Sequence, residues 1–290
     1  MTAPRVTIVS VLYNSMAVVG RMLASVPPGT PVVLVDNGTD DRSVLRALAK
    51  SQGATLIENE TNTGFGAGCN LGAAAAGTEF VLFLNPDAEL APGALEALLK
   101  AADAHPEAAA FNPVIREANG KSGVRRRSVL VPRSDWQTGP LPDIDFTVPI
   151  LSGAAFFVRR DRFEAVGGFD DGIFLYHEDD DLSLRLQDRF GPLMVARAAE
   201  TIHHQGNSSV RTPQSAAFKA WHMGRSRVYT RRKHGHSLPF LSSFGAALWQ
   251  LGSPDVLFSA RKRAKRWALL KGVVSEYSGE SPQPDGGNRH

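Results

Sequence analysis

The stretch RVTIVSVLYNSMAVVGRMLASVPPGTPVVLVDN, residues 5–37, decides the fold class. It begins with an apolar run rich in β-branched side chains at 5–13, passes through a segment with helical spacing, and ends in a second apolar run at 31–37. Neither run alternates regularly with polar residues, so neither predicted strand has a face in water. Strands buried on both faces are typical of a parallel sheet that helices cover on its two sides.

The same alternation of strand and helix patterns extends over the first half of the chain. Further strands are predicted at 54–59, 79–85 and 108–115, and helices at 16–26, 41–52, 66–77 and 92–105. In the less regular second half we predict a strand at 146–160, a short helix at 160–168, a strand at 192–204 and a polar helix at about 212–234. We therefore expect an α/β fold with a mostly parallel central sheet flanked by helices.

Composition limits the class of protein. With 290 residues, 43% hydrophobic and 21% charged, the chain is ordinary globular material with room for a large core. A formal net charge of +3 gives no reason to expect a nucleic-acid partner. The single cysteine, Cys69, excludes an intrachain disulfide, and the first residues lack the pattern of a secretion signal. No apolar run approaches the roughly 20 residues of a membrane span, so we expect a cytoplasmic protein.

Polar residues gather where the predicted strands end. These ends carry Tyr13, Asp36, Asn59, Asn85 and Asp87. Each residue by itself is consistent with an ordinary turn, because Asn and Asp are common there. Ligands of open α/β sheets bind at the carboxyl ends of the strands, so a row of polar ends along one edge predicts a binding site.

A glycine-rich segment, GFGAGCNLG at 64–72, raises the alternative of a dinucleotide-binding oxidoreductase. In that class the glycines follow the first strand and an acid comes about twenty residues later. Here the glycines follow the third predicted strand and Asp36 precedes them, so this kind of phosphate binding is not expected. The sequence also lacks the phosphate-loop pattern G-x-x-x-x-G-K-[ST] and the G-x-S-x-G nucleophile pattern.

Six blocks, in this order and spacing, carry a family resemblance: TIVSVLYNS, VVLVDNGTDD, NTGFGAGCNLG, FLNPDAEL, LSGAAFFVRRDRFEAVGGFDDGIFLYHEDDDLSLRL and IHHQGNSS. Over about residues 4–235 the chain resembles the family 2 inverting glycosyltransferases of the GT-A fold, and within them the bacterial rhamnosyltransferase-like group. The resemblance implies transfer of a sugar from a dTDP- or UDP-linked donor to a hydroxyl of a glycan or of a polyprenyl-diphosphate-linked acceptor. It favours rhamnose from a dTDP donor, a divalent cation (Mg²⁺ or Mn²⁺) as cofactor, and a role in bacterial polysaccharide assembly.

The resemblance also assigns the cation. Asp87 matches the second acid of the family's D-x-D motif, while Asn85 replaces the first acid, so we expect a weakly held ion completed by phosphate oxygens and water. His203 matches the histidine of the family's H-x-x-G-x-S motif, together with Gly206 and Ser208. Because neighbouring strand residues point to opposite faces, only one of the two adjacent histidines can face the diphosphate, and the motif selects His203.

Four adjacent acids, Glu178–Asp181, precede an amphipathic run. An inverting transfer needs one carboxylate that takes the proton of the acceptor hydroxyl. Helical spacing predicts that Asp179 faces inward with Leu186, whereas Asp181 lies on the opposite side and pairs with Arg185. The family's E-D-x-D-L motif places the catalytic base on the same residue, Asp179.

The resemblance assigns the remaining contacts of the two substrates. The predicted nucleotide-sugar contacts are Tyr13, Asp36, Asn62, Gly66, Asn70 and Asn85, and the predicted acceptor contacts are Ser152, Gly153 and Glu178. Asp36 can accept a hydrogen bond from the N3–H group that uracil and thymine share, so it selects a pyrimidine without distinguishing the two.

The C-terminal third is locally basic. We expect a glycosyltransferase domain at 1–235, a basic helical extension at 236–277 and a disordered tail at 278–290. The segment SARKRAKRWALLKGVV at 259–274 has two interpretations: a packed helix with a solvated face, or peripheral attachment to the anionic inner face of the cell membrane, where a lipid-linked acceptor would lie.

Two other functions use similar folds. A nucleotidyltransferase would carry a glycine-rich loop with Arg and Lys after its first strand, and this chain has none. A catalytically inactive sugar-nucleotide or glycan-binding module is the second alternative. It is disfavoured because the metal acid, the base and the histidine are all present in the sequence.

Overall fold

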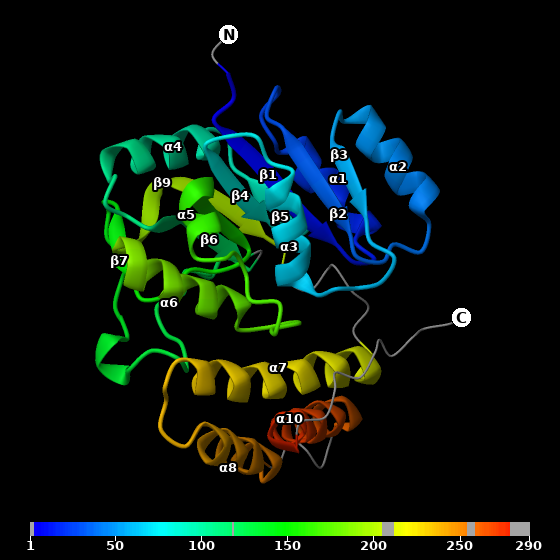
Figure 1. The fold of residues 1–290 in the computed structure, drawn as a ribbon, viewed down its shortest axis with the longest axis vertical. Coiled ribbons are helices and arrows are strands. Elements are labelled where there is room, and N and C mark those ends of the chain that lie inside the picture. The colour runs from blue at the N-terminus through cyan, green and yellow to red at the C-terminus, as the bar shows by residue number, and fades with distance from the viewer. Residues whose placement is uncertain (1–2, 118, 205–211, 254–258, 279–290) are drawn as a thin grey trace. The chain divides into compact units, whose positions relative to one another are not determined.

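Figure 1 shows the fold in a computed structural model, which describes residues 3–117, 119–204, 212–253 and 259–278. The chain forms two compact units. The first consists of Met1–Asp170 and Glu178–Ser208, and the second of Asp171–His177 and Ser209–His290. From residue 279 on, the tail expected to be disordered lies outside the described residues.

The strands of the first unit form one sheet. They are β1 (Val6–Leu12), β2 (Val32–Asp36), β3 (Thr55–Glu58), β4 (Phe80–Leu84), β5 (Ala88–Leu90), β6 (Ala110–Glu117), β7 (Phe146–Val148), β8 (Ala155–Arg159) and β9 (Leu193–His203). Their order is β3-β2-β1-β4-β8-β6-β9-β5, and β7 pairs with β9. Strands β1 to β4 are parallel, as the alternation of strand and helix patterns predicts, and β6 is parallel to β9. Antiparallel pairs join β8 to β4 and β6, and join β5 and β7 to β9.

Helices cover both faces of this sheet. They are α1 (Met16–Ala24), α2 (Arg42–Ser51), α3 (Phe65–Ala74), α4 (Ala94–Ala104), α5 (Arg160–Ala165) and α6 (Glu178–Phe190), with a 3-10 turn, η1, at Arg133–Asp135. Within β1, Ile8 belongs to a buried cluster with α1, α2 and α4, whereas Val9 belongs to a second cluster with α3, α5 and α6. This two-sided burial explains why the strand runs are so continuously apolar. Cys69 of α3 is a core residue, and burial raises the pKa of its thiol well above the ordinary value.

Two parts of the sheet differ from the prediction. The strand expected at 146–160 is two strands, β7 and β8, because the chain leaves the sheet at 149–154. Pro149, which has no N–H group to donate to a ladder, begins the interruption. The short strand β5 was not predicted, since three residues carry too little pattern, and it pairs with β9 so that Ala88 lies opposite His203.

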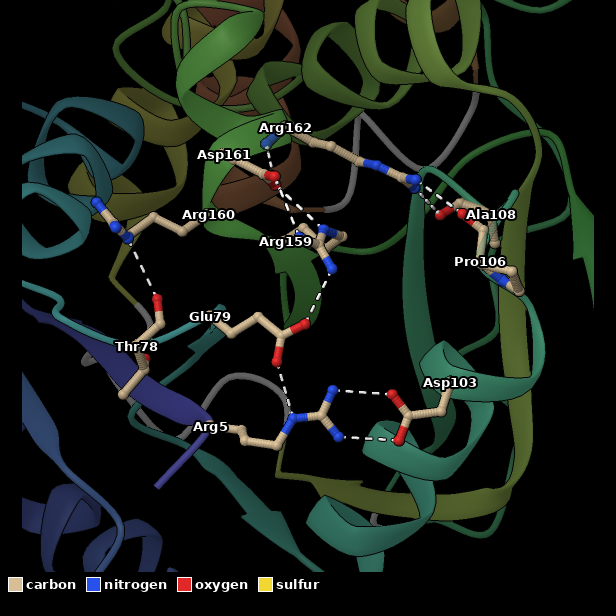
Figure 2. Close-up of polar contacts among 10 residues, drawn as sticks. All are labelled: Arg5, Thr78, Glu79, Asp103, Pro106, Ala108, Arg159, Arg160, Asp161 and Arg162. Atoms are coloured by element: carbon tan, nitrogen blue, oxygen red, sulfur yellow. Dashed lines mark hydrogen bonds and ion pairs between the residues drawn. The ribbon is translucent and has the colours of Figure 1, made fainter. Parts of the chain in front are cut away.

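Figure 2 shows a network of ion pairs at the amino ends of β1 and β4. Arg5 pairs with Asp103 through both terminal nitrogens and with Glu79 through Nε, all at 2.8 Å, and Arg159 pairs with Glu79 at 2.9 Å. The guanidinium groups of Arg5 and Arg159 also lie over the Phe80 ring. Because these ions are partly exposed to water, each pair contributes little by itself. The network ties β1, β4, β8 and α4 together at the end of the sheet opposite the carboxyl ends of β1 and β4.

The second unit contains α7 (Pro213–Lys233), α8 (Pro239–Leu251) and α10 (Ala260–Ser278). Helices α7 and α10 approach so closely that glycine is required at the contact. A Cβ atom on Gly224 would lie 2.2 Å from the carbonyl oxygen of Leu269, and one on Gly272 would lie 1.9 Å from that of Trp221. Helix α7 thus belongs to the same compact unit as α8 and α10, and the domain boundary expected at residue 235 stays a prediction. None of the described helices is both long enough and apolar enough to span a membrane.

Candidate active site

Tyr13 and Asp36 lie at the carboxyl ends of the neighbouring strands β1 and β2. The Asp36 carboxylate is fully buried: Oδ1 accepts from the N–H group of Gly38 at 3.1 Å, and Oδ2 pairs with Nε of Arg42 at 3.0 Å. Gly38 has φ +131°, and a Cβ atom there would lie 3.2 Å from the Tyr13 ring, so only glycine lets the ring lie against the chain. Tyr13 is 45% exposed and presents an aromatic surface beside the buried acid. Sequence reasoning missed Arg42, which resembles an ordinary first-turn base.

The loop before α3 and the helix itself are held by side-chain amides. Asn62 accepts from the N–H group of Gly64 at 2.9 Å, which shapes the turn into the helix. Asn70 is bonded at both ends of its amide to Phe169, donating to the carbonyl at 2.9 Å and accepting from the N–H group at 2.8 Å. A Cβ atom on Gly66 would lie 2.9 Å from Cβ of Phe169. Gly66 and Asn70 thus dock α3 onto Phe169, and their contact with a donor stays a prediction.

Asp87 and His203 lie side by side because β5 pairs with β9. The carbonyl oxygen of Asp87 accepts from the N–H group of His204 at 2.9 Å, which continues this pairing. Oδ1 of Asp87 lies 3.3 Å from Nε2 of His203, and Nδ1 of the same ring lies 3.7 Å from Oε1 of Glu117. Asp87 is buried and the His203 ring is nearly so. The sequence motifs identified this pair, but gave no indication of Glu117.

The arrangement offers two ligands to a cation. Burial opposes protonation of His203, but its hydrogen bond to Asp87 and the charge of that carboxylate, with Glu117 beyond it, outweigh burial and raise the pKa of the imidazole. A carboxylate oxygen and an imidazole nitrogen suit Mn²⁺, and the oxygen also suits Mg²⁺. Within the described part of the chain, no three His, Cys, Asp or Glu side chains are grouped to hold an ion. Gly206 and Ser208, the motif partners of His203, lie outside the described residues.

The four acids at the start of α6 have different surroundings. Glu178, Asp180 and Asp181 are buried, whereas the side chain of Asp179 keeps 15% of its exposure. Asp181 pairs with Arg185 one turn along the helix at 2.7 Å, as predicted. Burial, with the charges of Asp179 and Asp180, raises the pKa of Glu178 well above its ordinary value. Asp179 is thus the acid of this group with the best access to a substrate.

Arg125 bridges two of these acids. Its Nη1 donates to Oδ2 of Asp179 at 2.8 Å, and its Nη2 lies 2.6 Å from Oδ1 of Asp180. Ser128 donates to the other oxygen of Asp180 at 3.0 Å. Burial opposes the charge of the guanidinium, yet the two carboxylates outweigh it and raise the pKa of Arg125. Sequence reasoning missed this residue, because the run VRRRSVLVPR at 124–133 showed only that the segment is basic.

The prediction from helical spacing was wrong about which acids of α6 face the protein. Asp179 was expected to face inward and Asp181 to lie on the opposite side, but Asp180 and Asp181 are fully buried and Asp179 is the most accessible. The helix is covered on several sides: the segment before η1 covers Asp180, and Arg185 beside Asp181 donates to the carbonyl of Val166 at 2.7 Å. Helical spacing predicts one buried apolar stripe, so it does not predict that a polar face of the same helix is also buried.

The interruption between β7 and β8 connects the end of β4 with α6. The N–H group of Gly153 donates to Oδ2 of Asp179 at 2.9 Å, and the N–H group of Asn85 donates to the carbonyl of the residue after Gly153 at 3.0 Å. The N–H group of Ser152 donates to the side chain of Asn112 at 2.6 Å, which fixes the loop. Backbone contacts thus bring Asn85, Gly153 and Asp179 to one place.

A family comparison identifies the chain. Its residues 7–167, more than half of its length, match the family described as Glycosyl transferase family 2. The chain is a family 2 glycosyltransferase. The matched region includes Asp36, Asp87 and Gly153 and ends before α6, so it contains neither Asp179 nor His203.

Two relatives show which glycosyltransferases this chain is similar to. It is 30% identical over 260 residues to the N-acetylglucosaminyl-diphospho-decaprenol L-rhamnosyltransferase of Mycobacterium tuberculosis, a match that covers 78% of this chain and 84% of the relative. It is also 37% identical over 89 residues to Rhamnosyltransferase WbbL of Escherichia coli, covering 31% of this chain and 33% of the relative. The predicted resemblance to rhamnosyltransferase-like members of the family is confirmed.

The solved structures establish the fold of this glycosyltransferase. A mannosyltransferase from Pyrobaculum calidifontis, in complex with GDP-Man and Mn²⁺, superposes with a TM-score of 0.60 at 17% identity, covering 97% of this chain and 89% of that one. At this identity the likeness concerns the fold alone, which is the predicted GT-A fold. On that fold, the carboxyl ends of the strands carry an aromatic ring beside a buried acid and an Asp–His pair, and the start of α6 carries an aspartate held by a backbone N–H group and a guanidinium.

Proposed function

We propose that this glycosyltransferase transfers rhamnose from a dTDP donor to a hydroxyl group of a polyprenyl-diphosphate-linked sugar, with inversion at the anomeric carbon. One observation carries the proposal: among the four acids of α6, Asp179 is the accessible one, and it is aimed by Gly153 and Arg125. The name of the Mycobacterium tuberculosis relative supports the choice of sugar and acceptor, because that match spans most of both chains.

In the proposed reaction, Asp179 acts as the general base. The acceptor oxygen attacks the anomeric carbon of the donor, the bond from that carbon to the diphosphate oxygen breaks, and the acceptor proton passes to a carboxylate oxygen of Asp179. The electron pair of the broken bond leaves with the nucleoside diphosphate. Gly153 and Arg125 bind Oδ2 of Asp179 and so fix the orientation of the carboxylate before the acceptor arrives.

Asp87 and His203 would hold the divalent cation. When bound, a divalent cation neutralises charge on the leaving diphosphate. The fit rests on their 3.3 Å separation and their burial at a strand end. Titration of the donor into wild-type protein and Asp87→Ala, with Mn²⁺, with Mg²⁺ and with EDTA, tests this part. We expect metal-dependent donor binding to weaken strongly in the variant, and equal donor affinity under all three conditions would contradict a cation at Asp87.

The donor base would bind at Tyr13 and Asp36. The exposed ring of Tyr13 offers a stacking surface for a planar base. The carboxylate of Asp36 is buried beside it, so accepting from a pyrimidine N3–H group requires the surrounding chain to open when the base binds. Arg42 holds one oxygen of that carboxylate, so it positions the acid. Since a polyprenyl-linked acceptor is held in a membrane, the protein would work as a peripheral membrane protein at the inner face of the cell membrane.

The decisive experiment measures nucleoside diphosphate release from dTDP-rhamnose, UDP-sugars and GDP-Man, with and without a short N-acetylglucosaminyl-diphosphate-lipid acceptor. We expect acceptor-dependent turnover that is fastest with dTDP-rhamnose, and a product whose anomeric configuration is inverted relative to the donor. Faster turnover with another donor would contradict the choice of rhamnose. Donor binding without turnover of any donor would instead indicate an inactive sugar-nucleotide-binding module.

A further inference from the structure

The exposed side of α8 is apolar. This helix contains no charged residue, and Leu241, Leu248 and Trp249 are exposed, with Trp249 at 86%. Their spacing places them on one face of the helix, which we call the apolar face, whereas the buried residues Ser243 and Ala247 lie on the other side. An ordinary surface helix has the reverse arrangement, with its polar side chains outward. Exposed Leu and Trp side chains gathered on one side of a helix, here with the small residues Ser242 and Gly245 between them, are typical of an interaction site.

Basic side chains of α10 lie alongside this face. Arg266 donates to the carbonyl of Gln250, next to Trp249, and the rings of Phe240 and Tyr277 stack with centroids 4.4 Å apart. The two helices therefore run side by side in opposite directions, and the beginning of α10 lies near the end of α8. The exposed basic residues at that beginning are Arg261, Lys262, Arg263 and Lys265.

The charge of the whole segment decides between possible partners. Residues 209–290 contain fourteen Lys and Arg side chains and four acids, Asp255, Glu276, Glu280 and Asp285, so the segment is strongly positive. A second copy of this chain would bring the same positive charge to the contact and be repelled. An anionic lipid surface offers both partners at once, since Trp and Leu enter the boundary of head groups and acyl chains while Lys and Arg bind the phosphates.

We propose that the apolar face of α8 inserts into the interfacial layer of an anionic membrane, with the basic start of α10 bound to its head groups. We assign this surface the role of keeping the protein at the membrane leaflet that carries the acceptor, and this role rests on the proposed function. Its binding to lipid can be measured without donor or acceptor.

The test compares vesicle binding of the full-length protein and two variants. Leu248→Ser/Trp249→Ser removes the most prominent part of the apolar face, and Ile144→Ser is the matched control, because Ile144 is 75% exposed and lies in the first unit. On vesicles of phosphatidylglycerol and phosphatidylcholine, we expect the double variant to bind at least about tenfold more weakly than wild type. Binding of the control variant should equal that of wild type.

A second variant tests the charged part of the surface. Replacing Arg261, Lys262, Arg263 and Lys265 with Gln removes exposed charges, while Arg266 stays because it holds α8. Binding to anionic vesicles should fall by about tenfold or more, and added salt should weaken wild-type binding far more than binding of this variant. Vesicles of phosphatidylcholine alone should bind wild type weakly.

Several outcomes would contradict the proposed membrane-binding surface. They are no binding of wild type to anionic vesicles, equal binding by the Leu248/Trp249 variant, or a concentration-dependent dimer in analytical ultracentrifugation that this variant dissociates. Transfer to a short soluble acceptor should be unchanged in the variant, which also shows that it is folded. If wild type binds vesicles but transfers no sugar, the proposed function is contradicted and the membrane-binding surface is supported. If it transfers sugar but does not bind vesicles, only the membrane-binding surface is contradicted.

Discussion

The carboxyl edge of the sheet and the outer face of α8 depart from the usual distribution of side chains in opposite ways. The sheet edge buries the acids Asp36 and Asp87, and the adjoining start of α6 buries Asp180, whereas α8 exposes Leu248 and Trp249. Both arrangements work against folding, because buried charge must be compensated and exposed apolar surface loses the gain of burial. These charges are compensated within the protein, since Arg42 pairs with Asp36, His203 with Asp87 and Arg125 with Asp180. On α8, only a binding partner could cover the exposed apolar side chains. The first region is therefore suited to a small ligand, and the apolar face of α8 to the surface of a membrane.

The largest effect in either of these two regions is expected from replacing the accessible acid, Asp179. Asp179→Asn keeps the shape of the side chain and an oxygen that can accept from Gly153, but it cannot take a proton. Turnover should fall by a factor of about 10² to 10⁴, the usual effect of a positioned base, with donor affinity nearly unchanged. Steady-state kinetics and donor titration measure both quantities. The control is Asp188→Asn, which changes an exposed acid on the same helix. Wild-type turnover in Asp179→Asn would show that Asp179 is not the base.

The second prediction tests whether Arg125 compensates the charges of Asp179 and Asp180. Arg125→Gln leaves Asp179 and Asp180 without their shared cation, and losing one partner of a buried ion pair costs about 3 kcal/mol of unfolding free energy. Turnover should also fall, because Arg125 no longer holds Oδ2 of Asp179 in place. Chemical denaturation and steady-state kinetics measure the two effects.

A matched control and a conservative variant complete this test. Arg126→Gln changes the neighbouring arginine, which donates to the carbonyls of Gly139 and Pro140 and not to an acid of α6, so it should change neither quantity much. Arg125→Lys should restore part of the turnover. Wild-type turnover in Arg125→Gln would mean that the arginine has no role in positioning the base.

A smaller effect is expected where the helices of the second unit touch. Gly272→Ala places a methyl group where a carbonyl oxygen already lies, and overpacking of this kind typically destabilises by about 1–3 kcal/mol. Gly245→Ala is the control, since a Cβ atom on that residue of α8 would meet nothing within 4 Å. Hydrogen exchange of α7 and α10 reports the loss locally. Equal protection in the two variants would contradict the close contact.

The smallest effect concerns the buried Glu178. Its folded-state pKa is raised, so the folded state binds more protons than the unfolded state and loses stability as pH rises from the ordinary pKa towards the raised one. Glu178→Gln cannot ionise and lacks this loss. Its stability relative to wild type should therefore increase between pH 5 and pH 8 in denaturation experiments. A constant difference between the two proteins over this range would show that Glu178 is not held protonated.

The sequence by itself determined the parallel half of the sheet, its covering helices and the family. Buried strands and amphipathic helices leave a local pattern, and residues beside a strand end must lie at the sheet edge, which is why Tyr13, Asp36 and Asp87 could be placed there. The pairing of Asp181 with Arg185 was also predictable, since it lies within one helical turn.

Only the tertiary structure decided how these parts meet. The unpredicted strand β5 brings Asp87 to His203, and a loop of no regular pattern brings Arg125 to Asp179 and Asp180. The same packing buries Asp181, which helical spacing had placed on the outer side, and leaves the apolar face of α8 exposed. The physical reason is shared: these contacts join segments far apart in the chain, and periodicity within a segment records that a face is apolar but not what will cover it.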